Sequence, residues 1–319
     1  MRKCRLFLVM LLLLCTLLNS TACFLQNSFA VFSDEARHIT LVVGTKRDQI
    51  GIVLDDIELV VCNYKGKELC RRSFKTEITH AEIYEGCALI QFNDNSIEVY
   101  SLENNEFQLL GKKSFSSEIK KAELFDWMID ENKGVFVLLS NGELWQSEAG
   151  KAIDSFTLLD AGICSEAYMA HYLTYISDDG TIHCWSAGEF FDTNSLISPD
   201  VLKDIYALEV ARFGGRDSVI GYGREKNYII NTLGDNSLEK IIDKDEMDVF
   251  FSKKGVEWSV LYHENEKWYY EGVTKDYKHL ISHEKRKTIT VPDGKLVFLV
   301  AGGVITYDEH EVKIQLVSR

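Results

Sequence analysis

The chain has 319 residues, of which 46% are hydrophobic and 11% aromatic, and only two are proline. This composition supports a large core built from many short strands and excludes an intrinsically disordered chain. The formal net charge of −14 repels nucleic acid, so we expect no nucleic-acid partner.

The first 22 residues predict a secretory signal peptide. Arg2, Lys3 and Arg5 precede thirteen uncharged, mostly leucine residues at positions 6–18, a stretch too short to span a bilayer in the usual way. Because this segment holds three basic and no acidic residues, cleavage leaves a mature chain with a net charge of −17. We expect export from a bacterial cell, with an uncleaved membrane anchor as the alternative.

The residues at 20–23, Ser-Thr-Ala-Cys, resemble the lipobox of bacterial lipoproteins, in which the cysteine becomes the lipid-modified first residue. The resemblance implies lipidation of Cys23 and membrane contact only through that lipid. The alternative is ordinary cleavage after Ala22. Either outcome places the domain outside the cytoplasm, secreted or lipid-anchored at the bacterial cell surface.

Residues 23–37 are expected to be a linker, and residues 38–319 contain one module that recurs seven times. Each copy has an apolar run, a polar turn and a second alternating apolar run, at 52–60, 88–100, 135–145, 172–185, 218–230, 258–270 and 296–307. The turns are 40, 47, 38, 46, 40 and 37 residues apart. A fixed period of this size, made of hairpins, predicts an all-β, seven-bladed β-propeller.

Additional apolar segments lie between the copies, and we expect each to be the inner strand of a blade. They are 39–43, 78–83, 119–124, 157–163, 207–213, 249–252 and 288–291. The alternating residues 311–318 are expected to supply an outer strand to the last blade. The result is about four antiparallel strands per blade, in a ring that must close because open sheet faces would expose apolar side chains.

Two copies resemble the repeat of the regulator of chromosome condensation family, in which apolar residues precede a Ser-Asp-Gly type turn and a tryptophan follows. They are residues 172–186 (YLTYISDDGTIHCWS) and 135–145 (VFVLLSNGELW). Ser186 stands where the family has glycine. The resemblance implies a seven-bladed ring and a recognition role, and it does not carry over nucleotide exchange.

Cys62 and Cys70 flank the turn at 64–68 symmetrically, which predicts that they lie opposite each other on a hairpin. Cross-strand distances allow a disulfide there, with two buried thiols that do not pair as the alternative. His183 alternates with apolar residues inside a strand, so we expect it to be structural.

His279 and His283 have the spacing of a metal pair on a helix but lack a third ligand, so we interpret them as part of a solvated loop. The aspartates of 241–248 lack the glycine and glutamate of a calcium loop. We also find no serine elbow, phosphate loop or nucleotide fingerprint. We therefore expect no metal, no cofactor and no catalytic residue.

Trp145, Trp185 and Trp268 follow turns in their copies, and we expect them to fill space between blades rather than to form a binding platform. The two longest steps mark 102–130 and 188–208 as insertions, which on repeat folds map to one face. Their aromatic residues are the expected binding set: Phe107, Phe125, Trp127, Phe190 and Phe191.

The sequence thus predicts an extracytoplasmic, non-catalytic binding module that recognises a protein or a glycan through rim loops. The alternative is an extracellular hydrolase or lyase that acts on glycan with paired carboxylates at the central channel. A structural role in an envelope complex is a third hypothesis.

Overall fold

The computed structural model describes most of the chain between residues 28 and 316. The described residues are 28–44, 49–84, 86–126, 133–147, 153–169, 172–178, 182–186, 189–192, 204–213, 216–223, 226–231, 238–243, 249–254, 257–264, 266–274, 286–300 and 303–316. In this part of the chain, no helix has the length and apolar character needed to cross a membrane.

The described residues form four-stranded antiparallel sheets, which we number in chain order and give from the inner to the outer strand. Sheet 1 is β2 (Ile39–Gly44), β3 (Gln49–Leu54), β4 (Glu58–Asn63) and β5 (Glu68–Ser73). Sheet 2 is β6 (Ile78–Tyr84), β7 (Cys87–Phe92), β8 (Ser96–Ser101) and β9 (Gln108–Ser114), with the 3₁₀ turn η1 (Glu103–Asn105) before β9. Sheet 3 is β10 (Ile119–Asp126), β11 (Lys133–Leu139), β12 (Leu144–Ser147) and β13 (Phe156–Asp160).

The remaining sheets follow the same plan, except the last. Sheet 4 is β14 (Ile163–Met169), β15 (Tyr172–Ser177), β16 (Ile182–Ser186) and β17 (Glu189–Asp192). Sheet 5 is β18 (Ile205–Phe213), β19 (Arg216–Gly223), β20 (Lys226–Asn231) and β21 (Leu238–Asp243). Sheet 6 is β22 (Val249–Lys254), β23 (Glu257–Glu264), β24 (Lys267–Thr274) and β25 (Lys287–Ile289). Sheet 7 is β26 (Leu296–Val300), β27 (Gly303–Tyr307), β28 (Glu311–Leu316) and β1 (Ser28–Ser33).

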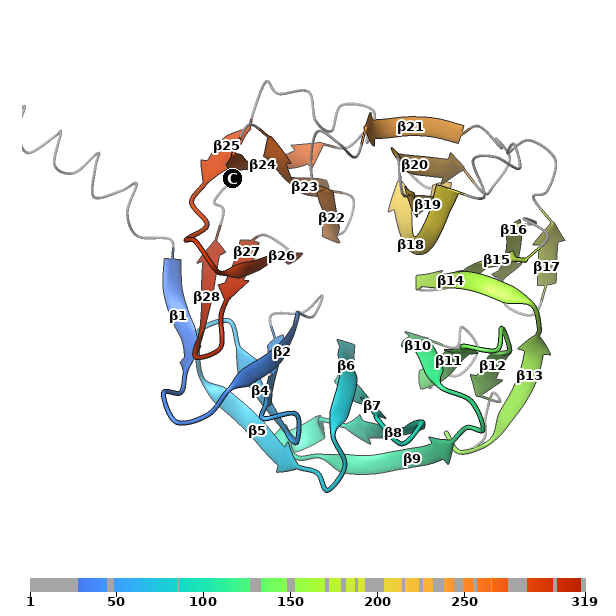
Figure 1. Ribbon diagram of the computed structural model, residues 1–319, viewed down its shortest axis with the longest axis horizontal. Helices are drawn as coiled ribbons and strands as arrows, with labels where there is room; N and C mark the ends of the chain where they lie inside the picture. Colours follow the sequence, from blue (N-terminus) through green and yellow to red (C-terminus); the bar gives the residue numbers. More distant parts are fainter. Residues whose placement is uncertain are drawn as a thin grey trace, which may run out of the picture.

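The sheets are arranged around a central axis, with the first strand of each toward the centre and the fourth at the perimeter (Figure 1). Inner strands of neighbouring sheets contact each other, as β2 contacts β6, β6 contacts β10, and β10 contacts β14. Sheets that stand side by side around an axis in this way form a β-propeller. The expected all-β propeller with four strands in each sheet is confirmed.

The two ends of the described chain share sheet 7. Strand β1 pairs antiparallel with β28, with Phe29 opposite Ile314 and Ser33 opposite Glu311. The expected linker at 23–37 therefore contains a strand. Because β1 takes the outer position, the segment 311–318, expected as an outer strand, supplies the third strand β28 instead.

The strand order also corrects two expected inner strands, which lie in sheets 3 and 6. Six of the seven recurring hairpins are the second and third strands of their sheets, whereas 296–307 forms the first and second strands, β26 and β27. The segments 157–163 and 288–291 overlap the outer strands β13 and β25. Short apolar segments of inner and outer strands look alike in sequence, because both contribute side chains to the packing between sheets.

Middle strands are buried on both faces, which explains their continuous apolar sequences. In β3 every residue from Ile50 to Leu54 is buried, whereas the outer strand β5 is largely exposed. A strand covered on both sides cannot alternate polar and apolar residues without placing polar side chains in the core.

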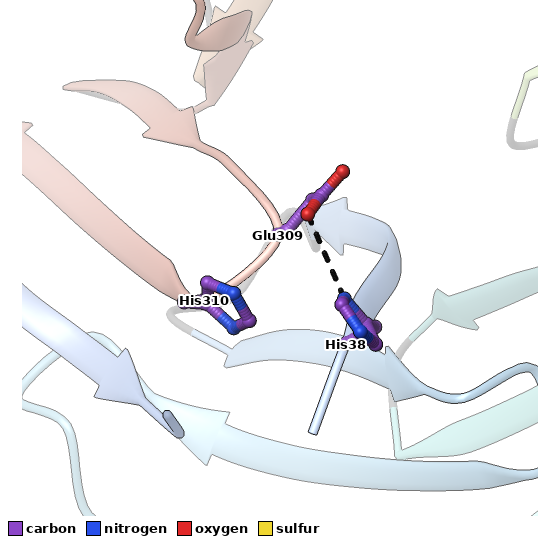
Figure 2. A group of neighbouring side chains, drawn as sticks. All are labelled: His38, Glu309 and His310. Atoms are coloured by element: carbon purple, nitrogen blue, oxygen red, sulfur yellow. Dashed lines mark ion pairs between the residues drawn. The ribbon is translucent and has the colours of Figure 1, made fainter. Parts of the chain in front are cut away.

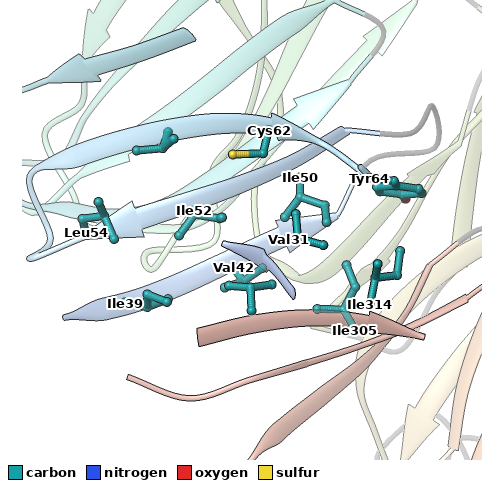
Figure 3. Close-up of a cluster of buried hydrophobic side chains, with 12 residues drawn as sticks. Val31, Ile39, Val42, Ile50, Ile52, Leu54, Cys62, Tyr64, Ile305 and Ile314 are labelled. Carbon is teal, nitrogen blue, oxygen red and sulfur yellow. The ribbon is translucent and has the colours of Figure 1, made fainter. Parts of the chain in front are cut away.

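One apolar cluster joins sheet 7 to sheet 1 (Figure 3). It combines Val31 of β1, Ile305 of β27 and Ile314 of β28 with Ile50 and Ile52 of β3, and each of these five is at most 4% exposed. Burial of each such side chain contributes about 1.5–3 kcal/mol. The first and last parts of the propeller are therefore held together by a core as well as by a strand pair.

The same backbone hydrogen bond recurs between sheets. The amide of the isoleucine that begins an inner strand donates to a carbonyl in the hairpin turn of the preceding sheet: Ile78 to Asp56, Ile163 to Gly142, and Ile39 to Glu309 at 2.7 Å. The contact from sheet 7 to sheet 1 thus repeats the contacts from sheet 1 to sheet 2 and from sheet 3 to sheet 4. The first and last sheets meet as neighbours, by the same local geometry.

Candidate functional site

A groove runs across the inner strands of three neighbouring sheets. It has a volume of about 560 Å³ and lies among β2, β6 and β10, with one residue from β7. The lining is mixed in character: Val42, Val43 and Ala81 are apolar, Thr79, His80 and Gln91 are polar, and Glu82, Lys120, Lys121 and Glu123 are charged. Its volume lies in the range of ligand sites, and most of the side chains that line it are polar or charged.

A repeated β-bulge shapes the inner strands. Each of β2, β6, β10, β14 and β18 begins with a buried isoleucine, and the pairing register shifts directly after it, which leaves one extra residue in the inner strand. Such bulges redirect side chains and bend the strand. Thr79 of β6 and Lys120 of β10 are the extra residues that line the groove.

The hydroxyl groups at two of these bulges make equivalent bonds. Thr79 Oγ1 donates to the carbonyl of Gln91 at 3.3 Å, and Thr40 Oγ1 donates to that of Val53 at 3.5 Å. The side chain of Gln91 in turn donates to the carbonyl of Ile119 in sheet 3, at 3.1 Å. Polar groups of the groove are thus tied to the backbone, which holds the lining in place.

Both carboxylates of the groove have partners. Glu82 Oε2 accepts a hydrogen bond from the amide of Leu124 in the next sheet at 2.7 Å, and Glu123 forms an ion pair with Lys121 at 2.8 Å. Glycoside hydrolysis needs one carboxyl group that donates a proton and a second one that acts as base or nucleophile. Glu82 joins sheets 2 and 3, and Glu123 balances the charge of Lys121 on the same strand, so each carboxylate already has a partner.

His80 has an altered titration. Solvent reaches its side chain through the groove, yet the surrounding strands lower its pKa by desolvation; Glu123 raises the pKa by a smaller amount and Lys121 lowers it. The imidazole is therefore neutral at pH 7, with one nitrogen that donates and one that accepts a hydrogen bond.

Two members of the expected binding set, Phe107 and Phe125, pack against other aromatic rings. Phe125 is 1% exposed and stacks on Phe136, with ring centroids 4.3 Å apart, so its assignment to a rim loop is wrong. It belongs to β10, which lies within the span 102–130 that was expected to be an insertion. Phe107 is half-buried and packs edge-on against Tyr100 at 5.6 Å, as part of the core between sheets 1 and 2.

The side chains of the other three members of the set lie outside the part of the chain that the structure describes. Phe190 and Phe191 lie in the outer strand β17, opposite Trp185 and Cys184, and their side chains lie outside the described part. Trp127, Cys23, His279 and His283 also lie outside the described residues. Lipidation of Cys23 and binding by Trp127 therefore stay predictions.

Cys62 and Cys70 are free thiols, and the expected opposition between them is wrong. A bulge after Val61 places Cys70 opposite Val61 and Cys62 opposite Glu68. Burial raises the pKa of each thiol to about 11, with the nearby Glu68 acting in the same direction. Both cysteines serve as small apolar residues of the core.

Two expectations about packing are confirmed. The ring of Trp145 packs edge-on against Phe115 in the core between sheets 2 and 3. His183 stacks on Tyr175, with centroids 4.8 Å apart, and its Nε2 lies 3.2 Å from Ser177 Oγ. Both side chains are structural.

Sequence reasoning missed the groove because its residues come from three modules and show no motif. The available signal was the recurrence of an isoleucine followed by a bulge residue at 39, 78, 119, 163 and 205. Aligning the modules on that isoleucine instead of on the hairpin turn would have placed Thr79 and Lys120 at equivalent positions.

No protein-family model matches the chain, and none of the curated proteins compared with it is similar. Solved β-propeller domains match nearly the whole chain. The β-propeller domain of Cps50 (Swd1) from Myceliophteria thermophila has 12% identity and a TM-score of 0.58, covering 91% of this chain and 100% of that domain. The WD40 domain of SCAP from fission yeast has 12% identity and a TM-score of 0.56, covering 90% and 86%.

The N-terminal domain of Nup159 has 10% identity and a TM-score of 0.55, covering 90% of this chain and 95% of that one. Similarity at this level of identity shows the fold alone, so the resemblance to the regulator of chromosome condensation family stays a prediction. These comparisons agree with the sheet topology: the chain folds as a β-propeller with neighbours among WD40 domains.

Proposed function

We propose that this protein is a non-catalytic binding module, a closed seven-bladed β-propeller that recognises a segment of another protein. The observation that carries the proposal is the groove across β2, β6 and β10, which combines apolar walls with fixed polar groups on rigid inner strands. Sites built on strands of a rigid scaffold hold a ligand more accurately than sites on loops.

The chemistry of the groove favours a polypeptide over a highly charged ligand. Two lysines and two glutamates balance each other, while Thr79, His80 and Gln91 offer neutral hydrogen-bonding groups beside Val42 and Val43. An extended peptide presents alternating amides, carbonyls and side chains that match such a surface. Among the structural neighbours, Nup159 occurs in a complex with the protein Dbp5, which supports a protein partner for this fold.

Closure of the ring into seven blades rests on the junction between sheets 7 and 1. There β1 pairs with β28, and Ile39 bonds to Glu309 as the corresponding isoleucines do at two other junctions. A closed ring leaves no long sheet edge exposed.

The proposed setting is outside the cytoplasm of a bacterium. It is supported by the signal-like residues 1–22 and by the lipobox-like Cys23, and the partner is then a protein of the cell envelope or the extracellular space. Mass spectrometry of the mature protein tests this: a chain that begins at Cys23 with lipid, or just after Ala22 without it, supports export, and an intact Met1 contradicts it.

Site-specific photocrosslinking tests the binding role. A photoreactive residue replaces Thr79 in the groove or, as the control, the equally exposed Gln108 on the outer strand β9. We expect a defined partner protein to crosslink from position 79 and not from position 108, and Lys120→Glu to weaken that crosslink by altering the charge of the groove. The same set of proteins from both positions, or an unchanged yield with Lys120→Glu, would contradict binding in the groove.

A further inference from the structure

Two histidines and a glutamate meet where sheet 7 joins sheet 1 (Figure 2). His38 lies just before β2, and Glu309 and His310 form the turn between β27 and β28. The imidazole rings are 5.2 Å apart between centroids, and His38 Nδ1 lies 3.6 Å from Glu309 Oε2. Each side chain offers a ligand atom, and these three atoms all lie within 4.8 Å of one another.

The backbone holds His38 firmly. Its amide donates to Asp55 Oδ1 at 2.9 Å, and its carbonyl accepts from the amide of Asp55 at 2.8 Å. The amide of the next residue, Ile39, donates to the carbonyl of Glu309 at 2.7 Å, which fixes the distance between the two chain segments.

The turn opposite is held equally well. Asp308 Oδ1 accepts hydrogen bonds from the amides of His310 at 3.0 Å and Glu311 at 2.9 Å, and the carboxylate of Asp308 pairs with Lys295. The carbonyl of His310 accepts from the amide of Asp34 at 3.0 Å. The backbone on both sides of the three side chains is thus held by hydrogen bonds.

One hydrogen bond selects the ligand atom of His310. Its Nδ1 lies 3.3 Å from the carbonyl oxygen of Arg37, and a carbonyl only accepts, so Nδ1 carries the hydrogen. In the neutral ring this leaves Nε2 with a lone pair. A histidine whose second nitrogen donates to a backbone carbonyl is the usual arrangement around a metal.

We infer that His38, Glu309 and His310 form a binding site for a divalent transition-metal ion of the Zn²⁺ class. Two imidazoles and one carboxylate are a common ligand set for zinc, with a fourth position left for water or another donor. Bonds of about 2.0–2.1 Å place tetrahedral ligands about 3.4 Å apart, so the present spacing closes by rotation of exposed side chains. Imidazole ligands favour such an ion over Ca²⁺ or Mg²⁺, which prefer oxygen.

The equivalent corners of two other junctions lack this ligand set. Glu77 precedes β6 beside the Asp55–Asp56 turn, and Gly162 precedes β14 beside Gly142, with no imidazole at either of these described positions. Among these three described junctions, the pair of histidines occurs at the one that joins the first and last sheets. Bound metal would link both ends of the propeller and stabilise the joint, since a ligand that binds only the folded state raises its stability.

Zinc titration of the whole mature protein, freed of metal with a chelator, tests the site. We expect Zn²⁺ to raise the thermal unfolding midpoint by several degrees and Co²⁺ to give the visible absorption of a nitrogen- and oxygen-bound ion. His38→Gln, Glu309→Gln and His310→Gln should each weaken zinc binding at least tenfold, because each removes a ligand.

Two controls separate this site from others. Glu77→Gln alters the equivalent corner of the next junction. The double variant His279→Gln, His283→Gln removes the histidine pair that the sequence offers elsewhere in the chain. Both variants should bind zinc as tightly as the natural protein does. Unfolding without zinc shows whether each variant folds, and three independent ligand variants keep the test decisive if one does not. The inference would be overturned if zinc did not shift the unfolding midpoint of the natural protein. It would also be overturned if folded His38→Gln and His310→Gln variants bound zinc as tightly as the natural protein.

Discussion

Replacing Gly51 with alanine should loosen the contact between sheets 1 and 2. Gly51 lies in β3, and a methyl group there would sit 2.6 Å from Ile83 Cδ1 of β6 and 2.7 Å from Val43 Cγ2 of β2. Both distances are shorter than real side-chain contacts, so the neighbours must move. Ile83 is only 2% exposed, which leaves it little room.

The magnitude follows from two opposing effects. Overpacking of a filled core costs about 1–3 kcal/mol. Alanine also restricts the unfolded chain more than glycine does, which stabilises the folded protein by about 0.4–1 kcal/mol. This gain applies here because the backbone of Gly51 is not in the left-handed region, which disfavours alanine. We therefore expect Gly51→Ala to lower the free energy of unfolding by about 1–2 kcal/mol.

Urea unfolding followed by tryptophan fluorescence measures this change. Ile83→Val removes the methyl group nearest the added one and by itself costs about 0.5–1.5 kcal/mol. The double variant should be more stable than the sum of the two single changes by at least about 0.5 kcal/mol. If Gly51→Ala is as stable as the natural protein, or if the two changes simply add, the close approach of the two sheets at this glycine is refuted.

Three further predictions concern titratable groups. Hydrogen bonds from Lys295 and from backbone amides lower the pKa of Asp308 from 3.8 to about 2, so its stabilisation is present above pH 4 and is lost as the pH falls toward 2. Asp308→Asn should therefore lower the free energy of unfolding by about 1 kcal/mol at pH 7, a value that solvent screening keeps small. The difference in stability between the variant and the natural protein should shrink in acid, and a difference that does not change with pH contradicts the lowered pKa of Asp308. Cys62, with a pKa of about 11, should resist alkylation at pH 8 until the protein unfolds, and it should form no disulfide with Cys70. A Cys62–Cys70 peptide in mass spectrometry would show otherwise. Because the pKa of His80 is lowered in the folded protein, the unfolded chain binds a proton at His80 more readily, and the free energy of unfolding should fall as the pH drops below 6.5. His80→Gln should make this fall between pH 7 and 5 less steep. An equally steep fall in the variant would show that His80 does not cause it.

The periodicity of the hairpins predicted the fold class well. Apolar residues on both faces of segments such as 52–60 and 135–145 reflect burial between neighbouring sheets. A strand buried on both faces has a continuous apolar sequence, which can be recognised without the structure. The strand β1 was missed because an outer strand is defined by its partner. The residues of β1 pair with β28 at the far end of the chain, and nothing local to 28–33 specifies that register.

Most of the candidate site could not be predicted from the sequence. Phe125 was placed on a rim by the length of its module, whereas its neighbour Phe136 and the strand pairing put it in the core. The groove and the histidine cluster both depend on side chains that meet only through the order of the sheets.

Closure of the propeller by β1 is tested most directly with a pair of cysteines across that strand pair. Ser33→Cys with Glu311→Cys places two thiols at directly opposite positions, whereas Ser33→Cys with Gln315→Cys is out of register. We predict that mild oxidation of the folded protein forms an intramolecular disulfide in the first variant and not in the second, as identified by peptide mass spectrometry. Equal yields for both pairs, or bridges only between molecules, would contradict a ring joined by its two ends.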